Sequence, residues 1–110
     1  MQISVRRTDK TTILDIAGDI DLAHSPEVRR VVLLEFRENR TPRVILNMRD
    51  VDYIDSSGVA SLVEALKASR DVGSRLILFG LTPVAREVLQ ISRLLTIFEI
   101  YDTEEKALEA

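Results

Sequence analysis

The 110-residue sequence contains no cysteine and only one histidine. Without cysteine the chain cannot form a disulfide, a thiolate nucleophile or a zinc–thiolate site. Acidic residues outnumber basic ones, and the net charge of −3 disfavours direct binding of nucleic acid, which requires a basic surface. The composition therefore excludes thiol chemistry and makes nucleic acid a poor candidate partner.

Long apolar runs are also missing from the chain. No stretch approaches the roughly 20 apolar residues that cross a bilayer, so we expect no membrane span. Residues 1–7 place their two arginines after the apolar residues and lack the apolar core of a signal peptide. We therefore expect a cytoplasmic protein.

What the chain does contain is typical of one globular domain. Apolar residues make up 45% of the sequence and charged residues 30%, a balance that supports a packed core rather than disorder. A length of 110 residues suits one domain built around one core.

Five segments have the patterns of β-strands. Ile3 and Val5 alternate with polar neighbours and Thr11–Ala17 is rich in β-branched residues, so we expect two strands joined as a hairpin at Asp9-Lys10. The other three strands are expected at residues 44–46, 76–79 and 97–101. The first two of these are continuous apolar runs, typical of central strands, whereas an internal glutamate indicates that the last is an edge strand.

The first helix is predicted from Ser25-Pro26-Glu27. Serine is a preferred N-cap and proline is favoured at the first helical position. The helix should end near Asn39, because Pro42 disfavours helical geometry in the residue before it. We expect a buried face of Val28, Val31, Val32 and Leu34, and a solvated face of Arg29, Arg30, Glu35 and Arg37.

Three further helices follow. The second is expected from near Ser57 to about Val72, with Gly73 as its stop. The third starts at Thr82-Pro83, and a short fourth helix opens at Thr103. The expected inward residues are Val84, Val88 and Ile91 in the third helix, and Ala107 and Leu108 in the fourth. The order β-β-α-β-α-β-α-β-α predicts an α/β domain without internal repeats or linkers.

Residues 50–62 carry the most distinctive pattern. Three aspartates, two serines and a glycine lie between the strand at 44–46 and the second helix. A serine there is a preferred N-cap, and the positive end of a helix can also hold an anion such as phosphate. The pattern is consistent with an ordinary capped helix or with a hydroxyl placed where a phosphate is tolerated.

Enzymatic alternatives fit this stretch poorly. A serine hydrolase needs Gly-x-Ser-x-Gly, but Ile54 and Asp55 stand where that motif needs its first glycine. His24 is the only candidate imidazole base, and we interpret it as a surface residue. No Gly-x-Gly-x-x-Gly follows a strand, so a dinucleotide fold is not supported. A receiver-like phosphoacceptor site would need a lysine before Pro83, and the chain has threonine there.

Five aspartates raise the question of a metal site: Asp19, Asp21, Asp50, Asp52 and Asp55. Their spacing does not match a calcium loop, which needs acids at alternate positions and a glycine at the sixth. Turn formation and helix capping account better for aspartates in these positions. We therefore predict no metal site, and a weak magnesium site stays the second interpretation.

Asp55-Ser56-Ser57-Gly58 and the residues after it resemble the STAS domain of anti-sigma factor antagonists. The likeness extends over nearly the whole chain. It includes the Gly-Asp-Ile-Asp turn at 18–21, the strand at 44–47, residues 77–80 and the tract at 89–98. The resemblance implies a single STAS domain over residues 1–110, with a mixed, mostly parallel sheet of about five strands and four helices. Ala60 departs from the family pattern, since many members have a second glycine there.

The resemblance also implies a regulatory protein that is not an enzyme and needs no cofactor. In the family, the serine directly after the aspartate is phosphorylated by a kinase that is also the anti-sigma factor, a histidine-kinase-like ATPase. Ser56 holds that position, with Ser57 as the second candidate. A serine phosphatase removes the phosphate, and the unphosphorylated protein captures the kinase so that the sigma factor is released.

The partner-binding surface implied by the resemblance contains Asp21, Asp55, Ser57 and Gly58. We expect Ser57 to cap or support the helix, because serine is favoured at that position. A second hypothesis is a STAS subunit that binds constitutively within a larger assembly, such as a lipid-transport ATPase complex or a stress-signalling scaffold. The two serines favour the first hypothesis, because a purely structural subunit has no need of the hydroxyl.

Overall fold

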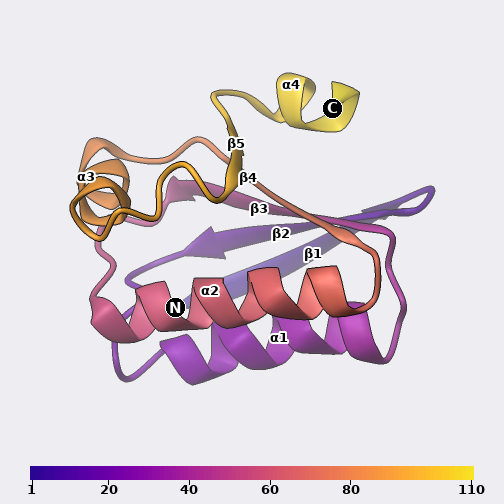
Figure 1. Cartoon of the computed structure of the whole chain (residues 1–110), viewed down its shortest axis with the longest axis horizontal. Helices are drawn as coiled ribbons and strands as arrows, with labels where there is room; N and C mark the ends of the chain where they lie inside the picture. The colour runs from indigo at the N-terminus through magenta and orange to yellow at the C-terminus, as the bar shows by residue number, and fades with distance from the viewer.

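The computed structural model describes residues 1–110 and contains five strands and four helices in the predicted order (Figure 1). The strands are β1 (Gln2–Thr8), β2 (Thr11–Ala17), β3 (Arg43–Asp50), β4 (Arg75–Phe79) and β5 (Glu99–Tyr101). The helices are α1 (Ser25–Arg37), α2 (Ser56–Asp71), α3 (Pro83–Ile91) and α4 (Glu104–Glu109). No helix is both long enough and apolar enough to span a membrane.

The strands form one mixed sheet in the order β1-β2-β3-β4-β5. β1 and β2 are the predicted antiparallel hairpin, and every other pair is parallel. Lys10 has a φ of 60° in the two-residue turn of the hairpin. β5 pairs only with β4, so the edge predicted from Glu99 is confirmed.

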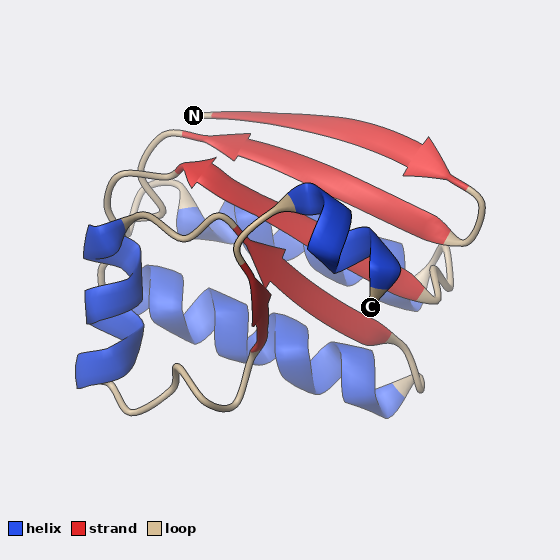
Figure 2. Cartoon of the chain, turned by 90° about the horizontal axis from the view of Figure 1, so that it is seen from above, coloured by secondary structure: helices blue, strands red, loops and turns tan.

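The two faces of the sheet are covered unequally. α1 and α2 lie side by side on one face, and α4 lies on the opposite face (Figures 1 and 2). The helical side encloses a core cluster of 21 buried residues, which gives the domain its main core. The other face has a cluster of five buried residues, which are Ile13, Ile45, Ile77, Phe79 and Ala107.

Ion pairs hold α4 against its face of the sheet. The Arg6 guanidinium on β1 lies 2.6 Å from a carboxylate oxygen of Asp15 and 2.6 Å from one of Glu104. These hydrogen bonds lower the pKa of both carboxyl groups. Arg43 donates to the backbone carbonyls of Leu108 and Ala110, at 3.0 and 2.9 Å. The short terminal helix is therefore tied to β1 through Arg6 and to β3 through Arg43.

The first helix differs from the prediction at its start. Ser25 is the first residue of α1 and His24 is the N-cap, so the prediction of Ser25 as the cap was wrong. The Ser25 side chain is buried, and its backbone N–H donates to the Asp21 carbonyl at 2.7 Å. His24 makes no side-chain cap bond. The Asp21 carbonyl therefore supplies the hydrogen-bond partner for the first N–H of α1.

Glu35 is buried, although the charge pattern predicted a solvated position for it. Only 2% of Glu35 is exposed, whereas the apolar Leu34 beside it is 44% exposed. The carboxylate accepts hydrogen bonds from Arg7 at 2.6 Å, Asn39 at 2.7 Å and Thr41 at 3.0 Å. Burial alone would raise the pKa of Glu35, but the hydrogen bonds outweigh it and hold the pKa below the ordinary value. Polar partners from the hairpin and from the loop after α1 make an inward glutamate tolerable.

The third helix is rotated from its predicted orientation. Val88 packs partly buried against the core as predicted, but Val84 is 48% and Ile91 73% exposed, while Ala85 and Leu89 are fully buried. The Thr82 hydroxyl donates to the Val51 carbonyl at 3.0 Å and accepts from the Ala85 N–H at 3.2 Å. This cap holds α3 in a rotation that the apolar spacing alone predicted only in part.

A short parallel ladder joins the loops that follow β2 and β3. Ile20 and Ile54 form a parallel bridge, in which the Ile20 N–H donates to the Tyr53 carbonyl at 2.9 Å. The Asp55 N–H donates back to the Ile20 carbonyl at 3.3 Å. A Cβ on Gly58 would lie far inside contact distance of the Ile20 carbonyl and 2.8 Å from Ile54 Cγ2. The first turn of α2 therefore packs directly on this ladder, with no room for a side chain.

Gly58→Ala should destabilise the domain even though alanine is the better helix former. Alanine gains about 1 kcal/mol in helix propensity, but it clashes with backbone that the ladder holds in place, and overpacking typically costs about 1–3 kcal/mol or more. We expect a net loss of about 2 kcal/mol in the free energy of unfolding, measured by urea denaturation. Ser57→Ala in the same turn is the control and should change it by less than about 0.5 kcal/mol. Equal stability of the two variants would contradict the close packing.

Glu35→Gln should lower the free energy of unfolding by about 1–3 kcal/mol at pH 7. Because the folded-state pKa of Glu35 lies below the ordinary value of 4.5, its stabilisation is complete above that pH and is lost as the pH falls through the folded-state pKa. The difference in the free energy of unfolding between wild type and variant should therefore narrow as the pH falls below 4.5. Urea denaturation across pH 3–7 measures it. Glu38→Gln, at an exposed position just after α1, is the control and should unfold with nearly the wild-type free energy at every pH. If the difference between wild type and Glu35→Gln stayed constant across the pH range, the charge of Glu35 would not be what stabilises the fold.

Candidate functional site

The loops after β2 and β3 converge with the first turn of α2 on one edge of the domain. We call this surface, formed by residues 18–24 and 50–58, the serine edge. It lies at the carboxyl ends of the two parallel strands, where α1 and α2 both begin (Figure 1). The ladder between Ile20 and Ile54 fixes the two loops relative to each other.

Asp55 is the N-cap of α2 and cross-links the serine edge. One carboxylate oxygen accepts from the Gly58 N–H at 3.0 Å, and the other accepts from the Leu22 N–H at 3.0 Å. The sequence analysis predicted a serine as the N-cap of this helix. That prediction was wrong, because Asp55 lies one residue before Ser56 and its carboxylate accepts the capping bond from the Gly58 N–H. Both oxygens are engaged within the chain, so Asp55 shapes the surface more than it offers a charge to a partner.

The two serines differ in exposure and in surroundings. Ser56 is the first residue of α2 and is exposed, whereas Ser57 is half-buried. Neither hydroxyl has a hydrogen-bond partner within the chain, although the Ser57 carbonyl accepts from the Ser61 hydroxyl at 3.1 Å. Asp55 caps the helix, so the predicted capping role of Ser57 was wrong. Both hydroxyls are unengaged.

Gly58 and Asp21 occupy contrasting positions. Gly58 is buried against the ladder, so it offers no contact surface to a partner. Its role is to let the first turn of α2 pack closely against the loop after β2. Asp21 Oδ1 accepts from the His24 N–H at 3.1 Å and pairs with His24 Nδ1 at 2.7 Å. Partial desolvation opposes these bonds, but they lower the pKa of Asp21, which stays ionised. Its second oxygen makes no bond within the chain.

The surroundings of the serines are acidic and partly apolar. Asp19, Asp50 and Asp52 are exposed on the same loops. No three histidine, aspartate or glutamate side chains come close enough together to hold a metal ion. Leu22 is 74% exposed, and Tyr53 is the other large exposed side chain of the edge. The arrangement can offer a partner protein a hydroxyl, negative charge and apolar contact area.

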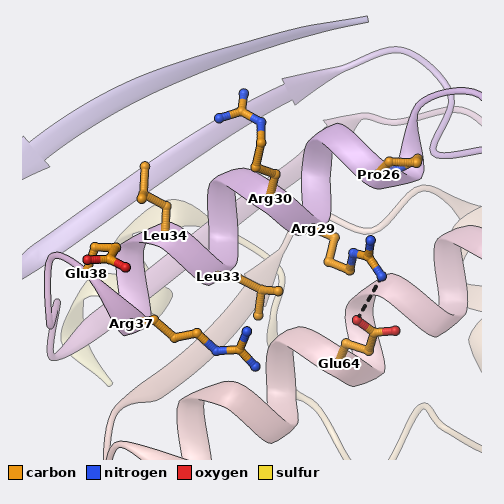
Figure 3. Close-up of a pocket in the computed structure, with 8 residues that line it drawn as sticks. All are labelled: Pro26, Arg29, Arg30, Leu33, Leu34, Arg37, Glu38 and Glu64. Carbon is orange, nitrogen blue, oxygen red and sulfur yellow. Dashed lines mark hydrogen bonds and ion pairs between the residues drawn. The ribbon is translucent and has the colours of Figure 1, made fainter.

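A groove that the sequence did not predict runs from the serine edge along α1. Near Ser57 it has a volume of about 230 Å³, and it continues into a larger groove of about 670 Å³. Figure 3 shows the larger part, where Arg29 pairs with Glu64 of α2 at 3.3 Å. Pro26, Arg29 and Glu64 line both parts. The arginines at its rim follow the predicted solvated face of α1, but only the packing of α1 on α2 creates the groove.

Comparisons with known proteins show the family and the fold. The STAS domain family model matches residues 2–107. An anti-sigma-B factor antagonist of Listeria monocytogenes is 32% identical over 105 residues, which cover 94% of this chain and 90% of that protein. The crystal structure of TM1081 from Thermotoga maritima matches with a TM-score of 0.90 at 25% identity, covering 97% of this chain and 92% of that one.

The anti-sigma factor antagonist SpoIIAA from Bacillus shares the fold in two chemical states. Its unphosphorylated form matches with a TM-score of 0.76 at 23% identity, covering 98% of this chain and 96% of that one. Its phosphorylated form matches with a TM-score of 0.75 at 24% identity, covering 98% and 97%. The family model, the relatives and the fold agree with the resemblance noted in the sequence, and the chain belongs to the STAS domain family.

Proposed function

We propose that this chain is an anti-sigma factor antagonist that is switched by phosphorylation of Ser56. In the unphosphorylated state it binds an anti-sigma factor kinase, a histidine-kinase-like ATPase, and thereby frees the sigma factor. A serine phosphatase resets it. The observation that carries the proposal is the exposed, unbonded hydroxyl of Ser56 at the start of α2, on an acidic edge. The names of its relatives support the same role.

Ser56 is a better acceptor than Ser57 because a kinase must reach the hydroxyl. Ser56 is exposed at the first helical position, while Ser57 is half-buried in the groove between α1 and α2. The Ser57 hydroxyl lines that groove and is less accessible than the Ser56 hydroxyl at the helix start. We therefore assign the phosphate to Ser56 and a surface role to Ser57.

The start of α2 is suited to hold the phosphate without a change of fold. The first N–H groups of a helix lack intrahelical acceptors, and the helix dipole places positive potential there. A phosphate at this point is therefore favourably placed. The two forms of SpoIIAA match this chain almost equally well, which supports a switch that leaves the backbone in place.

The charge of the phosphate explains how the protein could release its anti-sigma factor without a change in the backbone. A phosphoserine adds about −1.5 to −2 charges at neutral pH, and Asp19, Asp50 and Asp52 are already exposed nearby. Like-charge juxtaposition at an interface costs several kcal/mol. A loss of about 3 kcal/mol weakens binding more than a hundredfold, which is enough to reverse the equilibrium.

The other implied site residues divide into two groups. Asp21 keeps one free carboxylate oxygen and Ser57 has a free hydroxyl, so both can touch the partner directly. Asp55 and Gly58 instead set the relative positions of the two loops. In this scheme the chain acts by binding in the cytoplasm, and we expect no catalytic activity or cofactor of its own.

Ser56→Ala should abolish phosphate incorporation. The protein is incubated with ATP and a histidine-kinase-like anti-sigma factor from the same genome, and intact mass is measured. Wild type should gain one phosphate, Ser56→Ala none, and the matched variant Ser57→Ala should still gain one. Incorporation that persists in Ser56→Ala but vanishes in Ser57→Ala would move the acceptor to Ser57. A stable complex without phosphate transfer, by an ATPase shown to be active, would favour the constitutive subunit instead.

Phosphorylation should weaken binding to the same ATPase at least about a hundredfold. The Kd values of the purified unmodified and phosphorylated proteins are compared by titration calorimetry at low and moderate salt. Because the penalty is electrostatic, the ratio of the two Kd values should fall as salt screens the charges. Equal affinities would refute the charge mechanism, and a ratio independent of salt would point to steric exclusion.

A further inference from the structure

Leu22 is the most exposed large apolar side chain of the serine edge. Its side chain is 74% exposed, yet its backbone N–H is fixed by Asp55 Oδ2 at 3.0 Å. The neighbouring ladder between Ile20 and Ile54 restrains the same loop. Because the backbone of Leu22 is already restrained, it loses little backbone entropy when a partner covers the side chain, which favours its use in binding.

Leu22 also lines the groove of about 230 Å³ that adjoins the serines. Pro26 at the start of α1 and Ala60 in α2 are exposed members of the same lining. Ser57 contributes to this lining as well, so the apolar wall lies directly beside Ser57. The far wall carries the ion pair of Arg29 and Glu64 at 3.3 Å.

We propose that Leu22, together with Pro26 and Ala60, is the apolar anchor of the partner interface, and that an apolar side chain of the anti-sigma factor fills this groove. The inference rests on the function proposed above and extends it by naming the contact that supplies the affinity. Interfaces generally combine a small buried apolar centre with a polar rim. Here Leu22 supplies the centre and the exposed aspartates supply the rim.

Charge selects the kind of partner that can cover this anchor. Asp19, Asp50 and Asp52 are exposed on the loops that carry or adjoin Leu22. A second copy of this chain would bring the same acids against them, and the whole chain has a net charge of −3. The occupant is therefore a different protein, with basic side chains around an apolar one.

The anchor also connects the groove to the switch. A phosphate on Ser56 would lie next to Ser57, which is part of the groove wall. A phosphate group is strongly hydrated, and burying the apolar contact beside it would require removing part of that hydration. Loss of Leu22 should therefore weaken binding of the unphosphorylated form much more than that of the phosphorylated form.

The test compares Leu22→Ala with Ile91→Ala, because these two side chains are 74% and 73% exposed and Ile91 lies on α3, outside the serine edge. Binding to the same histidine-kinase-like anti-sigma factor is measured by titration calorimetry. We expect the Kd to rise at least about tenfold for Leu22→Ala and to stay within about twofold for Ile91→Ala. Leu22→Met, which keeps the apolar volume, should restore most of the affinity.

Kinetics of phosphorylation give a second readout. Leu22→Ala should raise the KM for phosphorylation with little change in kcat, because the anchor binds the kinase and does not touch the reacting hydroxyl. Urea denaturation of the variants should match wild type, since the side chain is exposed.

Each outcome has a separate meaning. If wild type does not bind the ATPase at all, the proposed function fails and this inference fails with it. If wild type binds but Leu22→Ala stays within about twofold, the function stands and the anchor is wrong. If sedimentation shows a wild-type dimer that Leu22→Ala dissociates, the occupant is a second copy and the inference is likewise overturned.

Discussion

Both carboxylate oxygens of Asp55 are bound to backbone N–H groups, one on the loop after β2 and the other in α2. The position of the serine pair depends on this cross-link. The Ile20 ladder, the bond from the Gly18 N–H to the Asp50 carbonyl and the packing at Gly58 join the same loops elsewhere, but none of them reaches Leu22. A short charged side chain thus acts as a structural tie, and the acids available to partners are its neighbours.

This division of roles explains how one edge can be both rigid and responsive. The atoms that fix the geometry are backbone groups, both carboxylate oxygens of Asp55 and a buried glycine, all of them in contact within the chain. The atoms open to contact are the Ser56 hydroxyl, one oxygen of Asp21 and the side chain of Leu22. In the proposed switch, a charge added to the second group would leave the first group in place, so binding would change while the fold would not.

Element order and strand character could be predicted from the sequence because they follow from periodicity and from Gly and Pro positions. The rotation of each helix about its axis and the identity of its capping residue could not be predicted, since they depend on partners far along the chain. Glu35 is inward because Arg7 and Thr41 reach it, and α3 is rotated by a threonine bond to Val51. Asp55 and Ser56 are both preferred caps, so propensity alone could not choose between them. The groove beside Ser57 requires the packing of two helices and has no local signal.

The order of strands in the sheet is also their order along the chain. Each new strand therefore adds to an edge that already exists, and no later segment has to insert between earlier ones. The serine edge uses only residues 18–58, and its loops follow the second and third strands. During synthesis from the N-terminus, every residue that shapes this edge is added to the chain before β4 and β5 are made. The serine edge belongs to the half of the domain that is translated first, and the later half completes the core behind it.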